Sequence, residues 1–307
     1  MNTPSPRYVA SFILRAIVSA GGLWVATAAG ADVAEPSADP RGDEEIHIRE
    51  VFTSHLPETM QANTLRLSIH PHFGDLHRKD NLRLSSGVRY GLTSNWEAGL
   101  ETDFFLSHGL GDERFFKQRG LATAQPSTKY NLGDGILPGW DAAVGADLIF
   151  PIGRPPAELT DGLRHYGPWV TFSRRIATHR GLRVFWGVGF DFIEPTHLAG
   201  TLEKGQIRDD NVYLNAGAVL DRGRLHYSFE ASVVTTRGLG GAAHDLLTLR
   251  PGIIWEIPTK RDTREKSNWI VGGAVNTRLG HDGTDIGVSV KFRYNLDLKR
   301  LLGLGPR

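Results

Sequence analysis

The chain contains no cysteine in 307 residues. Small exported domains often depend on disulfides, so this absence excludes a disulfide scaffold and requires another source of stability. Beyond the first 31 residues there is also no apolar window of about 18 residues, which excludes membrane-spanning helices. A sheet closed on itself satisfies both conditions, because it pairs its backbone groups internally and crosses a membrane with short strands.

The chain also lacks a large net charge of either sign. The formal net charge is +1, and without Arg7 and Arg15 the remaining chain carries 33 Lys and Arg against 34 Asp and Glu. This balance gives no reason to expect nucleic acid or a broad acidic partner.

The amino terminus has the pattern of a secretory signal peptide. Arg7 and Arg15 precede the apolar stretch "AIVSAGGLWVATAAG", and the small residues "AGA" at 29–31 suit a signal peptidase. We predict a signal peptide over 1–31, cleaved after Ala31, rather than an uncleaved amphipathic anchor. The acidic, Pro-bearing stretch that follows predicts a disordered periplasmic linker over 32–55.

The stretch "YGLTSNWEAGLETDFF", residues 90–105, alternates apolar and polar residues on both sides of a Thr-Ser-Asn break. Successive side chains of a strand point to opposite faces, so this pattern predicts a hairpin with one apolar and one polar face. The apolar face carries Tyr90, Leu92, Trp96, Ala98, Leu100 and Phe104, and the polar face carries Glu97, Glu101 and Asp103.

Similar alternation recurs along the chain and predicts about twelve strands. The runs cover 64–73, 83–92, 95–105, 121–131, 139–150, 164–177, 181–193, 209–220, 224–236, 244–256, 267–279 and 284–296. Their length suits a tilted membrane crossing better than the strands of a soluble sandwich. The long basic connection "IPTKRDTREKS" departs from the expected alternation of short turns and long loops, so ten or fourteen strands stay open.

Aromatic residues on the apolar parity gather near strand ends, as the interface girdles of a membrane barrel require. They are Trp96, Trp140, Trp186, Trp255, Trp269, Tyr90, Tyr227 and Tyr294. We therefore predict an all-β, transmembrane, antiparallel up-and-down β-barrel over 56–298 in an outer membrane, with a soluble two-sheet barrel or sandwich as the alternative.

Three stretches also carry a resemblance to a known family. "YGLTSNWEAGLETDFF" is similar to a "YGLTD-x-x-E-hydrophobic-G-hydrophobic" hairpin of the outer-membrane transporter family of the phenol-degradation MetA-pathway type, and "STKYNLGDG" resembles the next segment. "SHLPETMQANTLRLSIHPHF" resembles the family's first strand with its lead-in. The resemblance covers roughly 55–296 and implies a passive outer-membrane pore for small, hydrophobic or aromatic, compounds. It supplies no catalytic residue.

The stretch "DIGVSVKF", 285–292, is similar to the carboxy-terminal insertion signal of outer-membrane barrels. That similarity implies the barrel-assembly machinery as a partner. Fifteen residues follow it, where chains of the family usually stop, and we assign 299–307 to a C-terminal extension.

A search for reaction chemistry predicts no enzyme, no cofactor and no metal site. The nearest Gly-rich motif, "RGLGGAAH" at 237–244, lies between two predicted strands with no helix after it. His70 and His72 share a parity with His77 nearby, but without a fourth ligand we interpret them as rim histidines. Glu101 and Asp103 have the spacing of an acid/base pair, yet opposite basic strands they are better interpreted as ion-pair partners.

Charged residues on the polar parity define a predicted lumen. They are Arg66, Arg83, Arg89, Glu97, Glu101, Asp103, Asp141, Asp147, Arg183, Asp191, Glu230, Arg250, Glu256, Lys291 and Arg293. Seven cations against eight acids predict mutual pairing and a narrow, weakly ion-selective path.

The predicted function is a passive pore for small solutes. The alternatives are a structural barrel without transport and an outer-membrane lipid-modifying enzyme, and the expected partners are outer-membrane lipid and an unnamed small solute.

Overall fold

The computed structural model describes residues 51–73, 82–107, 120–152, 162–197, 210–236, 245–257, 269–280 and 283–297. Every regular element in this part of the chain is a β-strand. No helix of the described residues is long and apolar enough to cross a membrane. The predicted signal peptide, the linker up to residue 50 and the C-terminal extension lie outside the described residues.

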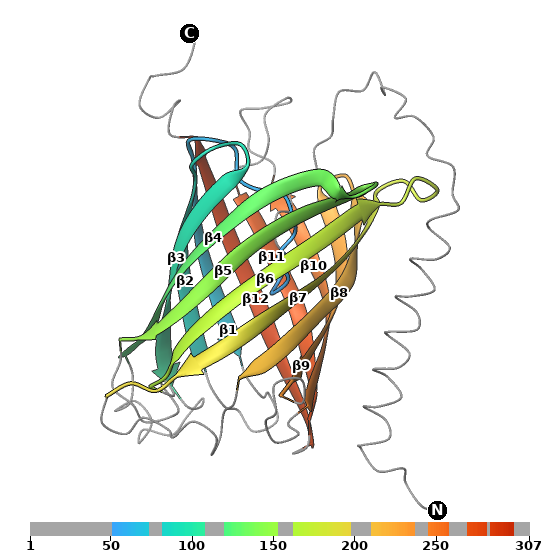
Figure 1. Cartoon of the computed structure of the whole chain (residues 1–307). Coiled ribbons are helices and arrows are strands. Elements are labelled where there is room, and N and C mark those ends of the chain that lie inside the picture. Colours follow the sequence, from blue (N-terminus) through green and yellow to red (C-terminus); the bar gives the residue numbers. More distant parts are fainter. Residues whose placement is uncertain are drawn as a thin grey trace, which may run out of the picture. The chain divides into compact units, whose positions relative to one another are not determined.

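Twelve antiparallel strands close into one barrel (Figure 1). Each strand pairs with its neighbours in chain order, and β1 pairs with β12 to close the sheet. The predicted all-β up-and-down barrel and the count of twelve are confirmed. The strands are β1 Thr64–Phe73, β2 Leu82–Gly91, β3 Trp96–Ser107, β4 Gly120–Leu137, β5 Trp140–Pro151, β6 Arg164–Arg175, β7 Leu182–Glu194, β8 Asn211–Arg222, β9 Leu225–Thr235, β10 Asp245–Ile257, β11 Trp269–Gly280 and β12 Gly283–Asp297.

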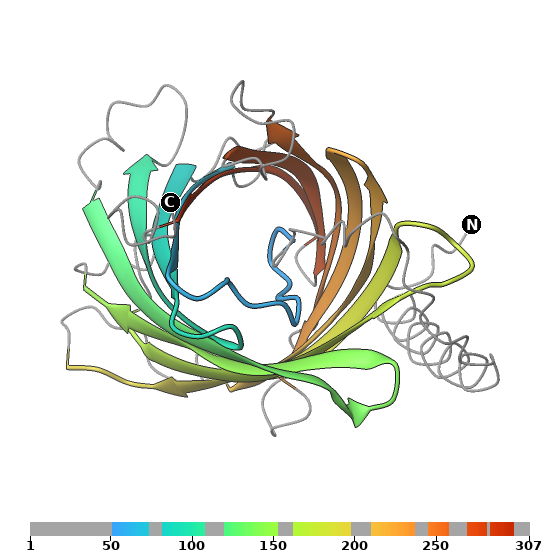
Figure 2. The same cartoon turned by 90° about the horizontal axis from the view of Figure 1, so that it is seen from above.

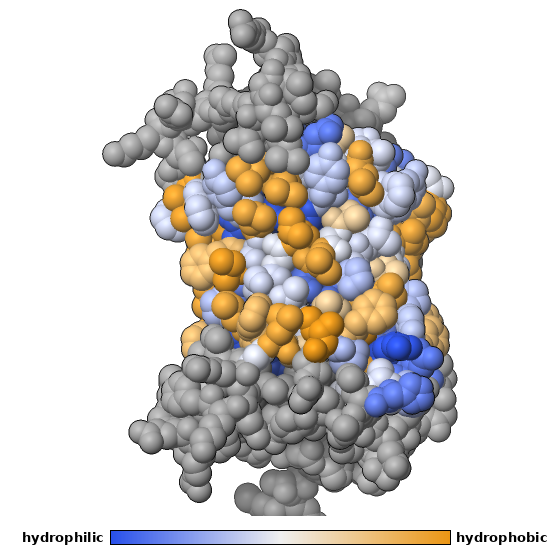
Figure 3. Space-filling view, turned by 90° about the vertical axis from the view of Figure 1, so that its left-hand side faces the viewer, coloured by the Kyte–Doolittle hydropathy of each residue, from blue (hydrophilic) through white to orange (hydrophobic). Residues whose placement is uncertain are grey.

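The outer face of the barrel is apolar around its circumference. Residues paired across a ladder point to the same face, so one parity of every strand joins into a continuous outer surface. Apolar residues cover much of the face seen in Figure 3. Large exposed side chains on this surface include Leu67, Ile69, Leu100, Phe104, Val144, Phe190, Phe192, Phe229, Ile253, Val275, Ile286 and Phe292. A closed barrel with this exterior matches the environment that lipid provides.

Exposed tryptophan and tyrosine residues gather at the end of the barrel where the chain makes its tight turns. Trp96 and Trp269 are the first residues of β3 and β11, and Tyr227 and Trp255 lie two residues inside the ends of β9 and β10 at the same end. Trp269 also packs against Tyr294, with ring centroids 4.6 Å apart. This row is where an aromatic girdle is expected at a membrane interface.

The long β4–β5 hairpin differs from the sequence prediction. We expected β4 to end near residue 131 and a turn over 132–138, whereas the strand continues to Leu137 and turns at Pro138 and Gly139. Gly139 has φ +72°, which glycine adopts at little cost in such a two-residue turn. The stretch expected to turn instead contains register shifts around Gly133, where the pairing with β5 is irregular but continues.

Prolines lie at gaps in four of the ladders, as their missing N–H requires: Pro71 in β1–β12, Pro126 in β4–β5, Pro168 in β6–β7 and Pro251 in β10–β11. Of these four, the last two are exposed. Pairing between β6 and β7 stops after Tyr166 and resumes at Trp169, across Pro168. Pairing between β10 and β11 stops after Leu249 and resumes at Gly252, across Pro251. Pro168 and Pro251 are on the exposed face, so these gaps lie in an otherwise continuous wall.

Candidate functional site in the barrel lumen

The inner face of the barrel is polar and charged. The fifteen charged residues selected from the sequence all lie on the parity opposite to the exposed apolar residues; Arg66, for example, pairs with Arg89 and alternates with exposed Leu67. Asp141 is exposed at the beginning of β5. Seven of the fifteen are buried, and they are Arg66, Glu97, Arg183, Glu230, Arg250, Lys291 and Arg293.

Much of this burial comes from a segment of the chain that lies inside the barrel. Residues 51–60, called the inner segment below, run across the lumen before the chain enters β1 (Figure 2). Val51, Leu56 and Met60 have 0% of their surface exposed. The sequence assigned 51–55 to the linker, whereas in the structure these residues contact the barrel wall.

Glu230 of β9 holds the first part of the inner segment. Its carboxylate accepts hydrogen bonds from the main-chain N–H groups of Phe52 at 2.8 Å, Thr53 at 3.2 Å and Ser54 at 2.9 Å. Arg250 lies beside it, 3.7 Å from the carboxylate, and donates to the Thr53 hydroxyl. Three N–H groups converging on one buried carboxylate form a charge-assisted site that fixes this part of the segment.

Two cations of β12 bind the same stretch through its carbonyl groups. The Lys291 ammonium donates to the carbonyls of Val51 at 3.0 Å and Phe52 at 3.2 Å. Arg293 donates to the Val51 carbonyl at 3.0 Å. Charges on the wall therefore satisfy the N–H groups of Phe52, Thr53 and Ser54 and the carbonyls of Val51 and Phe52, which offsets the penalty of burying these groups. The Val51 N–H donates to the Ser54 carbonyl at 3.1 Å within the segment.

An aromatic platform holds the middle of the inner segment. The ring of His55 stacks on Trp169 with centroids 4.2 Å apart and planes at 4°. Both rings also meet Asp147, which is 3.1 Å from His55 Nε2 and accepts from Trp169 Nε1 at 2.9 Å. The Thr171 hydroxyl donates to the His55 carbonyl at 2.9 Å. A small cavity borders this platform and is lined in part by Ser54, Phe185 and Tyr213.

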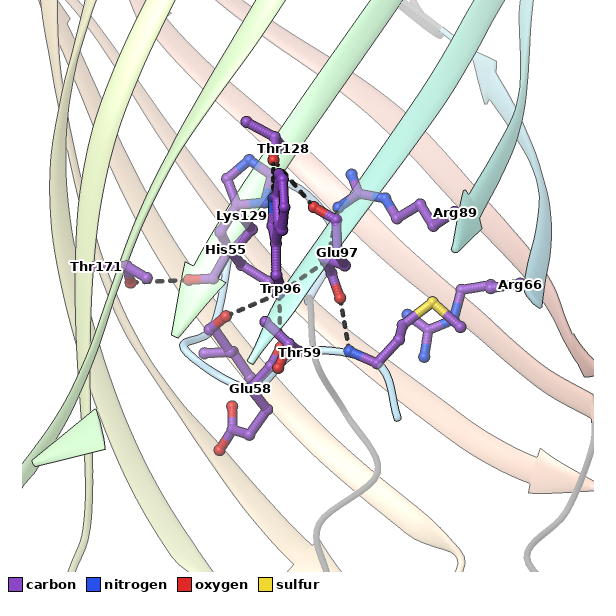
Figure 4. Close-up of polar contacts among 12 residues, drawn as sticks. His55, Glu58, Thr59, Arg66, Arg89, Trp96, Glu97, Thr128, Lys129 and Thr171 are labelled. Atoms are coloured by element: carbon purple, nitrogen blue, oxygen red, sulfur yellow. Dashed lines mark hydrogen bonds and ion pairs between the residues drawn. The ribbon is translucent and has the colours of Figure 1, made fainter. Parts of the chain in front are cut away.

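Charges from β3 and β4 hold the last part of the segment (Figure 4), together with a charge from β7. Lys129 donates to the carbonyls of Leu56 at 3.2 Å and Glu58 at 2.6 Å, and pairs with Glu97 at 3.2 Å. Glu97 also accepts from the main-chain N–H of Met60 at 2.7 Å. Arg183 forms an ion pair with Glu58.

The rest of the described inner face consists largely of paired polar groups. Glu101 lies 3.9 Å from His70, whereas Asp103 accepts hydrogen bonds from Ser85 and Gln125. The two carboxylates thus have separate partners, as expected for lumen pairing and not for an acid/base pair. Within the described residues no cluster of His, Cys, Asp and Glu could hold a metal ion, and His77 lies outside them.

Sequence reasoning did not select Lys129, His55 or the inner segment. Lys129 alternates with the exposed Tyr130, so its parity alone was enough to place it inside. The signal for the segment was the presence of Val51, Phe52, Leu56 and Met60 in a stretch expected to be linker. Disordered linkers are poor in such apolar residues, because they bury no core.

Comparisons with known proteins support the fold. No family model matches the chain. No curated protein matches it either. Among solved structures, the COG4313 outer membrane channel from Pseudomonas putida F1 is similar at a TM-score of 0.55 and 8% identity, over 78% of this chain and 98% of the other. The NanC porin is similar at a TM-score of 0.51 and 10% identity, over 75% of this chain and all of the other. At these identities the likeness concerns the barrel fold alone.

Proposed function

We propose that the chain is an outer-membrane channel that lets small solutes pass by diffusion. The observation that carries the proposal is the closed barrel with an apolar exterior and a charged interior. Lipid stabilises the first surface and water the second, so the sheet separates a polar path from the membrane. The two solved structures of similar fold are, by name, an outer membrane channel and a porin.

The inner segment limits what such a path admits. It crosses the lumen of a twelve-stranded barrel, which lies in size between the barrels of about eight strands that side chains fill and the porins of about 16–18 strands that enclose an aqueous channel. We infer that the intact protein conducts weakly and passes only small solutes. A preference for hydrophobic or aromatic solutes rests on the sequence resemblance alone, and the charged interior opposes it.

The location and the biogenesis are part of the same proposal. The signal peptide over 1–31 would export the chain, and the barrel-assembly machinery would insert it with outer-membrane lipid around the apolar face. We propose no catalytic role, because the wall charges described above are engaged in holding the inner segment and in pairing with one another.

Liposome swelling tests the function. Purified protein in liposomes is expected to admit small sugars, amino acids and simple phenols at rates above empty liposomes, and the rates should fall steeply with solute size. Phospholipid hydrolysis is measured in the same samples. Hydrolysis without flux would favour a lipid-modifying enzyme, and neither flux nor hydrolysis would favour a structural barrel.

A further inference from the structure

We propose that the inner wall carries a peptide-binding site, and that the inner segment occupies this site as a detachable ligand. The ligand class is a peptide with apolar anchors and an acidic residue, and it binds with bends at residues 52, 53 and 57. The consequence for conductance rests on the proposed function, whereas the binding itself does not.

The wall recognises main-chain N–H and C=O groups, which every peptide carries. Carboxylates of Glu230 and Glu97 accept from four N–H groups of the segment, those of Phe52, Thr53, Ser54 and Met60. Lys291, Arg293, Lys129 and Thr171 donate to five carbonyls, those of Val51, Phe52, His55, Leu56 and Glu58. Within the inner segment only His55 is in a strand-type bridge, so side chains of the wall, and not its ladders, provide most of the binding.

Side chains of the segment add sequence preference at a spacing of four. Phe52 packs over two glycines, because a Cβ placed on Gly252 would lie 2.3 Å from its ring and one on Gly272 would lie 3.1 Å away. Leu56 and Met60 are fully buried. A peptide with apolar residues at these positions therefore fits the wall better than a peptide of the same composition in another order.

The charge of the wall selects an acidic or neutral peptide. Five cations contact the segment, and they are Lys129, Arg183, Arg250, Lys291 and Arg293. Three acids contact it, and they are Glu97, Asp147 and Glu230. The excess of cations matches Glu58 of the segment, which pairs with Arg183. A basic residue at that position would meet like charges from Arg183 and Lys129.

The same chemistry permits the segment to leave. Charged wall groups lose protein partners on release but gain water in the lumen, whereas an apolar wall would resist exposure. The segment continues into β1 through residues 61–63, where Asn63 has φ +64° and the Thr64 N–H closes a turn onto the Gln61 carbonyl at 3.1 Å. A short turn of this kind can act as the hinge about which the segment moves.

Thiol labelling in the full chain tests the proposal. The chain has no cysteine, so Leu56→Cys gives one reporter inside the segment and Ser289→Cys gives a half-buried control on the inner wall. Folded protein in liposomes is treated with a small water-soluble thiol reagent. Leu56→Cys should react slowly but measurably, and Ser289→Cys should react fast.

Removing wall charges that hold the inner segment should raise the rate at which Leu56→Cys is labelled. Glu230→Gln, or Lys291→Met if the first variant does not fold, removes charged hydrogen bonds and should raise the Leu56→Cys labelling rate by about tenfold or more. Glu101→Gln is the matched control, because its carboxylate pairs with His70 of the wall, and it should leave the rate unchanged. Heat-modifiable gel mobility verifies that each variant is folded.

A synthetic peptide of the sequence "VFTSHLPETM" tests whether the wall binds a peptide that is not part of the chain. In excess it should compete with the tethered segment and raise the labelling rate of Leu56→Cys, while a scrambled peptide and one with Lys in place of Glu58 should not. An unreactive reporter in every background beside a reactive Ser289→Cys would overturn the proposal, as would equal effects of native and scrambled peptides. If labelling behaves as expected but no variant conducts ions in a planar bilayer, the proposed function fails and the binding site stands.

Discussion

At the scale of single residues, the odd or even position of a residue in its strand decides which face of the sheet its side chain occupies. A glycine on that face decides how closely a neighbouring side chain can pack. Trp169 faces the lumen opposite Gly145, its partner in the β5–β6 ladder. A Cβ on Gly145 would lie 2.3 Å from the Trp169 ring and 2.6 Å from the Thr128 carbonyl oxygen. The absence of a side chain at Gly145 thus allows the indole to lie flat beneath His55.

Gly145→Ala is therefore expected to destabilise the barrel. The added methyl group must displace either the indole or the backbone of β4, an overpacking cost of about 1–3 kcal/mol in the free energy of unfolding. Urea titration of liposome-folded protein, followed by tryptophan fluorescence, measures it. Gly273→Ala is the matched control, since a Cβ there meets nothing within 4 Å, and equal losses in the two variants would contradict this account of Gly145.

At the scale of elements, alternation was sufficient to locate the strands but not the features that depend on contacts far apart in the sequence. Eleven of the twelve predicted runs end within two residues of the observed strands, because the apolar residues of each run mark the outer face of the barrel. The exception, β4, ends six residues later than expected, because its pairing with β5 continues past register shifts around Gly133. The inner segment was missed because its partners are up to 242 residues away.

The interrupted ladders lead to a prediction about local opening. Pro168→Val restores a main-chain donor in β6 at a residue that is exposed on the outer face. We expect amides of β7 near Phe190 to exchange more slowly, because a ladder with one more hydrogen bond opens less often. Hydrogen exchange with mass spectrometry measures the effect.

Pro251→Val is the reciprocal control, because its gap lies between β10 and β11. It should protect amides of β11 near Gly273 and leave β7 unchanged. Protection of both regions by either variant would mean that the gaps do not act locally.

At the scale of the whole molecule, the same twelve strands form an apolar outer surface and a charged inner surface. The sequence predicted this division, since Trp96, Leu100 and Phe104 alternate with Glu97, Glu101 and Asp103, and the closed sheet turns the alternation into an outside and an inside. How much of the inside is open was not predictable, because lumen occupancy depends on where the chain before β1 lies.

A pair of arginine substitutions at one depth of the barrel tests the division directly. Leu100 is 46% exposed on the outer face, and Gln125 pairs with its neighbour Glu101 on the inner face. Leu100→Arg places a charge among lipid tails and should lower the free energy of unfolding in liposomes by about 2–4 kcal/mol if the residue lies near the midplane. Gln125→Arg places the same charge beside Glu101 and Asp103, where ion pairing compensates it, and should cost less than about 1 kcal/mol. Urea titrations of both variants decide the matter: equal losses, or a larger loss for Gln125→Arg, would mean that the apolar face of this barrel does not contact lipid.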